Sequence, residues 1–176
     1  MFKPVIPALA VIGGKASGKT TAVETIVRAL TEKDLTIMTV KHVSDKGFTL
    51  DREGTDSWRH WKAGAKIVST VSDSERAILI KDNENVNLDE YNSWADRVDV
   101  IIFEGFSTLM LKEGNIGKII CLKERFEKET YLARLKGTVV ALCSLCLRGD
   151  GVLKFGIDDQ VIADRVIQYL STHSRE

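Results

Sequence analysis

The sequence predicts an α/β fold of three layers (αβα), in which a mainly parallel sheet is flanked by helices on both faces. Apolar runs of strand length alternate along the chain with segments whose apolar residues recur at helical spacing. These runs are continuous rather than alternating with polar residues, which is typical of parallel strands buried on both faces. The chain has 176 residues and no internal repeat, so we expect a single domain over residues 1–176.

The composition argues against several classes of protein. The 25 Lys and Arg residues balance 25 Asp and Glu residues, and this net charge of +0 speaks against a basic nucleic-acid surface or a polybasic membrane anchor. No apolar run approaches the roughly 18 residues of a membrane span. Residues 1–14 lead into glycines rather than into a cleavage site, so we expect no signal peptide. We therefore expect a soluble, cytoplasmic protein.

The first part of the chain alternates between strand and helix patterns. An apolar run at residues 8–12 precedes a glycine-rich turn, and apolar residues at spacings of one, three and four then predict a helix over residues 22–30. Residues 35–43 are rich in β-branched side chains, which favours a second strand. The elements expected next are a polar loop at 44–54, a helix capped by Thr55, Asp56 or Ser57, and a hairpin-like pair of runs at 66–71 and 77–80.

The rest of the chain continues this alternation. Apolar residues between positions 88 and 98 are spaced as in another helix, and residues 98–103 form the most strand-like segment of the sequence. The remaining expected elements are strands at 119–122 and 138–142 and a last helix that begins at Asp158 or Asp159.

A phosphate-binding motif follows the first predicted strand. Residues 13–20 read GGKASGKT and fit G-x-x-x-x-G-K-[ST] without a mismatch. The glycines let the backbone curl so that successive N–H groups point at phosphate oxygens, and the following helix adds the positive end of its dipole. The sequence therefore predicts a P-loop NTPase-like fold whose single domain binds a nucleoside triphosphate.

Individual residues of this motif have distinct predicted roles. Lys19 would supply a cation to the β- and γ-phosphates, and the Thr20 hydroxyl would ligate Mg²⁺. Lys15 lies one place too late to be the extra lysine of the deviant loop of some dimeric ATPases, so it is assigned only to the cradle. The predicted nucleotide-binding residues are Gly13, Gly14, Lys15, Ala16, Ser17, Gly18, Lys19, Thr20 and Thr21.

A carboxylate on the magnesium side is expected from a neighbouring strand. Asp99 and Glu104 bracket the strand-like run, and five residues at about 3.3 Å each put them roughly 16 Å apart. Ligands of open parallel sheets bind at the carboxyl ends of the strands. Glu104 is therefore predicted as a catalytic and metal-site residue that holds a Mg²⁺-bound water or orients the attacking one, with an ordinary loop carboxylate as the alternative. Asp99 is interpreted as a turn or solvent-exposed residue.

Five further segments resemble stretches of the molybdopterin-guanine dinucleotide biosynthesis protein B (MobB) family: VKH at 40–42, GFTLD at 47–51, GTDSWR at 54–59, AGA at 63–65 and DVIIFEGF at 99–106. The resemblance implies a P-loop fold that binds GTP and Mg²⁺ with weak hydrolysis and forms homodimers. It also implies an adaptor role in molybdenum cofactor guanylation. The implied partner is the molybdopterin guanylyltransferase (MobA-like), and molybdopterin itself is a possible ligand.

Four residues near the motif remain candidates for contacts. Lys41 and His42 end the second predicted strand on the ligand side of the sheet, and they join Arg59 as possible contacts to a substrate or partner. Asp56 could reach the Mg²⁺ shell through water, or it could be a helix N-cap and nothing more. Both interpretations of Asp56 stay open at this point.

Guanine preference rests on the resemblance alone, because no Asn-Lys-x-Asp motif occurs in the chain. Asp150 is the nearest carboxylate after the strand at 138–142 that could replace it. The Cys143-x-x-Cys146 spacing could be half a zinc site, but small apolar residues at a strand end are the commoner case. Residues 109–111 (LML) could be an exposed partner contact or could pack onto the body, and packing is again commoner.

Two further function classes use the same loop. A small-molecule kinase needs a mobile lid with arginines, and only Arg125 and Arg134 fall in a plausible lid region. A metallochaperone GTPase needs a Cys/His cluster beside the nucleotide, which the Cys143 pair alone does not supply. The preferred hypothesis is the GTP-binding adaptor. We expect feeble turnover, because no Arg or Gln is evidently placed to complete the catalytic site.

Overall fold

The computed structural model describes residues 2–81 and 86–173. The chain divides into two compact units, which we describe separately. The main unit comprises Met1–His42 and Leu88–Glu176, and the second unit comprises Val43–Asn87. We expected one domain over residues 1–176; that the two units fold as one domain stays a prediction.

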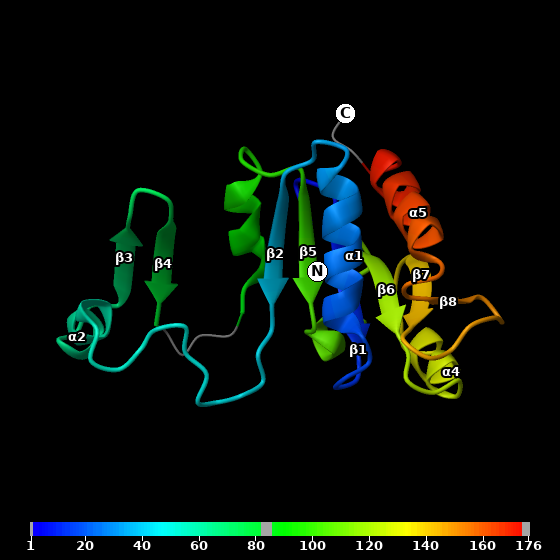
Figure 1. Ribbon diagram of the computed structural model, residues 1–176, viewed down its shortest axis with the longest axis horizontal. Helices are drawn as coiled ribbons and strands as arrows, with labels where there is room; N and C mark the ends of the chain where they lie inside the picture. The colour runs from blue at the N-terminus through cyan, green and yellow to red at the C-terminus, as the bar shows by residue number, and fades with distance from the viewer. Residues whose placement is uncertain (1, 82–85, 174–176) are drawn as a thin grey trace. The chain divides into compact units, whose positions relative to one another are not determined.

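The main unit is built on a parallel sheet, as the continuous apolar runs predict (Figure 1). Its strand order is β2-β5-β1-β6-β7-β8, and each neighbouring pair is parallel. The order places β1 between β5 and β6, so the loop that follows β1 lies at the centre of the carboxyl edge. The strands are β1 (Ala8–Gly13), β2 (Ile37–Lys41), β5 (Val100–Glu104), β6 (Gly117–Cys121), β7 (Val139–Ser144) and β8 (Val152–Lys154).

Helices and apolar side chains cover both faces of this sheet, which confirms the three predicted layers. On one face α1 (Lys19–Thr31) and α5 (Asp159–Ser171) pack on alternate strand residues such as Leu9 and Val11 (Figure 1). On the other face Ala10 and Ile12 belong to a second buried cluster with residues of α3 (Ser107–Met110) and of the amino-terminal segment, and side chains of α4 (Glu127–Leu132) pack against it. Within the described residues, no helix is long and apolar enough to cross a membrane.

The helix α1 forms where the apolar spacing predicts it. Ala22, Ile26 and Leu30 recur every four residues and are fully buried against the sheet. The helix begins at Lys19, directly after Gly18, whose backbone is left-handed with φ of 94°. The first turn of a well-packed helix therefore stands at the end of β1.

Some elements differ from the sequence-based expectation. The helix expected from position 88 is a 3₁₀-helix at Leu88–Trp94, in which Ser93 donates to the carbonyl of Glu90 and Asn92 bonds to the amino-terminal segment. Such local and tertiary side-chain bonds compete with a regular α-helix. The second strand is shorter than residues 35–43. The three-residue β8 and the short α3 and α4 were not expected, because so few residues show no clear periodicity.

Among its described residues, 43–81 and 86–87, the second unit has one helix and one hairpin. The helix α2 (Asp56–Lys62) is capped by Thr55, whose hydroxyl oxygen accepts a hydrogen bond from the Trp58 amide at 3.3 Å. The strands β3 (Ile67–Val71) and β4 (Arg76–Ile80) pair antiparallel, which confirms the predicted hairpin.

Candidate nucleotide-binding site

The loop between β1 and α1 has the backbone conformation that the motif predicts. Ala16 and Gly18 both have positive φ values, of 57° and 94°. A side chain at Gly13 would clash with the carbonyl oxygen of Cys121 and the hydroxyl of Ser17, and a Cβ at Gly18 would lie 2.9 Å from Leu145 Cγ. The curl of this loop therefore depends on glycine at both positions.

The polar groups inside this loop fit an anionic ligand. The Ser17 side chain is buried, and its hydroxyl has no hydrogen-bond partner within the described part of the chain. Lys19 folds back over the loop, where its Nζ donates to the carbonyl oxygens of Gly13 at 3.1 Å and Gly14 at 2.6 Å. A buried hydroxyl without a partner and an ammonium at a helix N-terminus are groups that a phosphate would engage.

Three side chains from distant segments meet beside this loop. Thr20 Oγ1 donates to Glu104 Oε1 at 3.0 Å, and Lys41 Nζ lies 2.9 Å from the same carboxylate oxygen and 3.4 Å from Thr20 Oγ1. Glu104 is buried although it carries a charge. The Lys41 ammonium therefore provides the counter-charge of a carboxylate that has little access to water.

Strand pairing explains this meeting. In the sheet register Glu104 of β5 pairs with Val11 of β1 on one side and with Lys41 of β2 on the other. Parallel strands end at the same edge, so the ends of β1, β2 and β5 bring these side chains to the start of α1. The hydroxyl of Thr20 and the carboxylate of Glu104 are the hard oxygen donors that Mg²⁺ prefers, and the site fits that ion. Their predicted roles as metal and catalytic residues stay predictions.

His42 lies at the same edge but contacts its neighbours differently. Its backbone amide donates to the carbonyl oxygen of Glu104 at 2.9 Å, and its ring lies 4.9 Å from the ring of Phe106. Gly105, which lies between Glu104 and Phe106 in the chain, has φ of 89°, and a Cβ there would lie 3.3 Å from the His42 Cβ. The Glu-Gly-Phe segment thus packs against the end of β2. A contact from Lys41 or His42 to a substrate or partner stays a prediction.

The two candidates in the second unit are engaged with each other. Asp56 Oδ1 accepts from Arg59 Nη1 at 3.3 Å, and both side chains are exposed. The interpretation of Asp56 as an N-cap is wrong, because Thr55 caps the helix and Asp56 is its first residue. Asp56 and Arg59 are three residues apart and form an ion pair on the surface of α2. Roles for Asp56 at the metal and for Arg59 at a partner stay predictions.

Several residues after β6 and β7 are held by ion pairs. Asp150, the candidate for base recognition, pairs with Arg125, which also donates to the carbonyl oxygen of Arg148. Arg148 in turn grips the Asp158 carboxylate through two nitrogens, at 2.9 and 2.6 Å. Arg125 and Arg148 are therefore anchored to carboxylates in this structure.

The cysteines divide between core and surface. Cys143 is buried in β7 beside Cys121 of β6, and Cys146 is exposed. Burial raises the pKa of Cys121 to about 12 and raises that of Cys143 as well, so both thiols stay protonated at neutral pH. No group of three or more His, Cys, Asp or Glu side chains in the described ranges is arranged to hold a metal ion. Met110 and Leu111 are buried, which agrees with packing onto the body.

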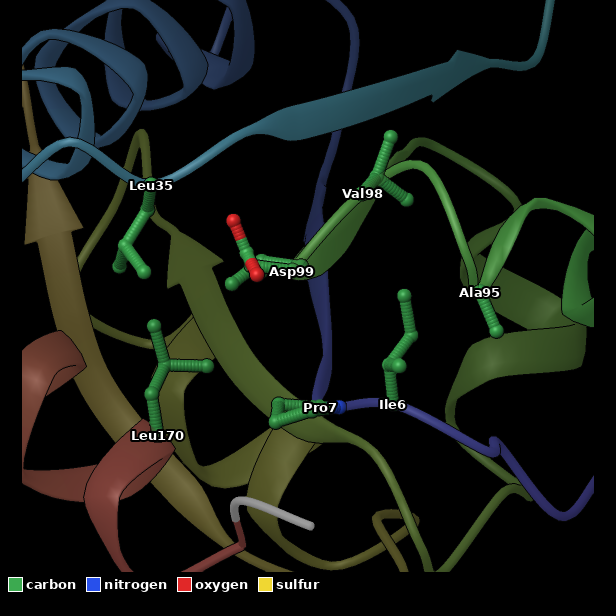
Figure 2. A pocket seen from close by; sticks show the side chains of 8 residues that line it. Ile6, Pro7, Leu35, Ala95, Val98, Asp99 and Leu170 are labelled. Atoms are coloured by element: carbon green, nitrogen blue, oxygen red, sulfur yellow. The ribbon is translucent and has the colours of Figure 1, made fainter.

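A separate pocket of about 300 Å³ lies at the opposite, amino edge of the sheet (Figure 2). Asp99 lies on this pocket, and its Oδ2 accepts a hydrogen bond from the Thr36 amide at 2.7 Å. This contact joins the start of β2 to the start of β5 and puts Asp99 at the end of its strand opposite Glu104. The pocket is mostly apolar and is lined by Ile6, Pro7, Leu35, Ala95, Val98, Asp99, Val100 and Leu170.

Comparison with known proteins agrees with this geometry. The model of the family described as "Molybdopterin guanine dinucleotide synthesis protein B" (MobB) matches residues 8–145. The chain belongs to the MobB family. The match begins with β1 and extends past β7, so it includes the phosphate loop, Lys41 and Glu104.

Curated MobB relatives come from bacteria and archaea. The molybdopterin-guanine dinucleotide biosynthesis adapter protein of Haemophilus influenzae is 33% identical over 125 residues, which are 70% of this chain and 67% of that protein. A putative adapter protein of Methanocaldococcus jannaschii is 38% identical over 121 residues, 66% of this chain and 47% of that protein. The match thus spans about half the length of the archaeal relative.

Solved MobB structures share the fold. The Bacillus subtilis MobB crystal structure superimposes with a TM-score of 0.69 at 24% identity, covering 94% of this chain and 98% of that one. A MobB homologue from Bacillus stearothermophilus gives a TM-score of 0.67 at 20% identity, covering 93% and 98%. At these identities the likeness establishes the α/β fold.

Proposed function

We infer that this protein is a Mg²⁺-dependent GTP-binding adaptor with weak GTPase activity that acts in molybdenum cofactor guanylation, that is, in molybdopterin guanine dinucleotide biosynthesis. Membership of the MobB family and the names of the curated relatives support the pathway. The observation that carries nucleotide binding is the glycine-dependent loop, in which Lys19 donates to loop carbonyls and the Ser17 hydroxyl has no partner among residues 2–81 and 86–173.

Each residue of the site has a role in this proposal. Lys19 leaves the carbonyls of Gly13 and Gly14 to bind the phosphates, and the Thr20 hydroxyl and the Glu104 carboxylate hold the metal, Glu104 through a water molecule. Bound Mg²⁺ neutralises negative charge that develops on the terminal phosphate. The loop amides orient the phosphate chain and act on the same charge.

Slow hydrolysis follows from the arrangement of the other side chains. Arg125 and Arg148 are bound to Asp150 and Asp158, so neither is free in this structure to stabilise the transition state. The anchoring of Arg125, one of the two candidate lid arginines, weakens the alternative of a small-molecule kinase, and the metallochaperone alternative has no specific support.

The partner and assembly belong to the same proposal. The relatives' names contain the word adapter, which supports association with the guanylyltransferase of the pathway. The cytoplasmic location and the homodimer belong to the proposal through the sequence analysis alone. Co-purification of the two proteins, with and without GTP, tests this association. Phosphate transfer to an added pterin or nucleoside instead of such association would favour the kinase.

Calorimetric titration of GTP and ATP, with Mg²⁺ and with a chelator, tests the nucleotide site. We expect GTP binding that requires Mg²⁺ and that Lys19→Ala weakens by about a hundredfold, because a charge-assisted contact to phosphate is lost. Lys33→Ala is the matched control, since Lys33 is an exposed lysine just beyond the other end of α1. Unchanged GTP affinity in a folded Lys19→Ala protein would refute the assignment.

A further inference from the structure

The Lys41 ammonium contacts both groups that are proposed to hold the metal. Its Nζ is 2.9 Å from Glu104 Oε1 and 3.4 Å from Thr20 Oγ1, and these two oxygens are 3.0 Å apart. One cation thus lies against the hydroxyl and carboxylate pair where a second cation is expected to bind.

The pairing of β2 with β5 fixes the backbone of Lys41 beside that of Glu104. Lys41 and Glu104 are direct partners in the register of β2 and β5, and the amide of the next residue, His42, bonds to the Glu104 carbonyl. The Glu104 side chain is 11% exposed, whereas that of Lys41 is 54% exposed. The carboxylate is held in place, while the lysine has room to swing into solvent.

Lys41 and a metal ion would compete for the same oxygens. Glu104 Oε1 already accepts from both Lys41 and Thr20, and the Thr20 hydroxyl directs its proton toward Glu104. A divalent cation held directly by Thr20 and through a water molecule by Glu104 would require these lone pairs, and the ammonium would be repelled by the added positive charge.

We propose that Lys41 is a built-in counter-ion of the metal site: it neutralises Glu104 when no metal is bound, and Mg²⁺ displaces it. This inference rests on the proposed function, because it assumes that Thr20 and Glu104 form the metal site. The stem of Lys41 stays fixed at the end of β2, so the displaced ammonium remains at the carboxyl edge and becomes available to an anionic ligand. Binding of the metal and release of the Lys41 ammonium from Glu104 are therefore two parts of the same exchange.

Binding of Mn²⁺ to the nucleotide-free protein tests the exchange. Mn²⁺ replaces Mg²⁺ as a probe whose free form is measured by electron paramagnetic resonance. We expect Lys41→Met to bind Mn²⁺ about tenfold more tightly than the wild type, because the metal no longer has to displace a charge-assisted contact. Lys41→Gln should show the same change, and Lys33→Met, on an exposed lysine away from the site, should show none. Equal Mn²⁺ binding in wild type and both Lys41 variants, including none in any, would overturn the proposal.

Thermal unfolding gives a second readout. Without metal, Lys41→Met should melt below the wild type, because Glu104 is left buried without its counter-ion. With saturating Mg²⁺ and GTP this difference should disappear, since the metal has taken the place of Lys41. If Lys41→Met melts below the wild type by the same amount in both conditions, Lys41 remains bound to Glu104 in the presence of metal, and this result would overturn the exchange. If Mg²⁺ and GTP leave the wild-type melting temperature unchanged, the proposed function fails, while the Mn²⁺ titration still decides the role of Lys41.

Discussion

The buried side chain of Lys118 forms hydrogen bonds to two loops. It lies in the central strand β6 and is fully buried, and its Nζ donates to the main-chain carbonyls of Glu113, Ile116 and Lys136. The Glu113 carboxylate, also buried, accepts from the amide of Phe2. Two loops at the amino edge of the sheet, one before β6 and one before β7, therefore depend on one ammonium group.

Replacing Lys118 should lower the free energy of unfolding by more than the small change in side-chain size suggests. Lys118→Met keeps an apolar chain of similar length but leaves three carbonyl oxygens without their donor, at about 1–3 kcal/mol for each buried group that stays unsatisfied. Urea unfolding measures the loss. Lys112→Met is the control, because Lys112 is exposed in the same region. Similar losses for the two variants would contradict this role of Lys118.

The buried lysine also predicts a dependence on pH. Burial lowers the pKa of Lys118 to about 8 from its ordinary 10.5, and the Glu113 charge opposes the shift. Between these two values the unfolded chain binds the proton and the folded protein does not, so stability should rise with pH across that window. The slope is at most about 1.4 kcal/mol per pH unit.

Comparison with Lys118→Met isolates this effect. The difference in unfolding free energy between wild type and variant should move in favour of the wild type from pH 8 to 10.5, because other titrating groups cancel. A difference that is flat or falls over this range would rule out the lowered pKa.

At the level of elements, the junction of the phosphate loop and α1 depends on a single glycine. Gly18 has φ of 94°, and a Cβ there would press against Leu145 Cγ at 2.9 Å. Gly149 has a similar φ of 90°, but no atom lies within 4 Å of the position of its Cβ. Both positions have a backbone conformation that would strain an alanine, but only at Gly18 would the added Cβ also press against a neighbouring side chain.

This contrast predicts unequal effects of alanine at the two positions. Gly149→Ala should cost only the strain of a left-handed alanine, about 1 kcal/mol. Gly18→Ala should cost more and should also weaken GTP binding, because the loop must shift to relieve the clash with Leu145. Unfolding by urea and titration with GTP measure both quantities. Equal stability losses and normal GTP binding in Gly18→Ala would argue against a sterically fixed loop.

The start of α5 depends on a carboxylate that does not cap it. Asp158 stands at the N-cap position, yet its oxygens accept from Arg148 and from the Lys154 amide. Hydrogen bonding to Arg148 is the main cause that lowers the pKa of Asp158. The pair therefore ties the loop after β7 to β8 and to the last helix.

Loss of this pair should loosen the helix locally. We expect Asp158→Asn to raise amide hydrogen exchange in the first turn of α5 and in the loop around Arg148, since the neutral amide cannot accept both guanidinium bonds. Asp164→Asn, on an exposed residue of the same helix, is the control. Unchanged amide hydrogen exchange at the start of α5 would show that the Arg148–Asp158 pair contributes little to the stability of this helix.

At the scale of the whole main unit, the phosphate loop lies at the centre of the carboxyl edge of the sheet. It joins β1, a central strand, to α1, which packs against α5 and the sheet. A ligand held by this loop should therefore stabilise the main unit broadly. We expect Mg²⁺ and GTP at a hundred times their dissociation constant to add about 2.7 kcal/mol to the unfolding free energy, and a chelator to remove the gain. Stabilisation that persists without divalent metal would contradict metal-dependent binding.

Local patterns predicted much of this architecture. The phosphate loop, the helix after it, the parallel sheet and the hairpin of the second unit all follow from motifs and spacings within short segments. The position of Glu104 at the carboxyl edge followed from the length and direction of one strand. Such features are readable because spacing along a single segment sets which side chains share a face.

Pairing between distant segments determined the rest. Lys41 and Glu104 are far apart in the chain, and only the register of β2 on β5 puts the ammonium on the carboxylate next to Thr20. Nothing in the residues around Lys118 distinguishes it from an exposed lysine, because its three acceptors come from loops brought together by β6 and β7. The sequence by itself determined the elements and the phosphate loop, whereas the tertiary structure decided which charges meet, since strand register and loop packing are set by contacts that no single segment contains.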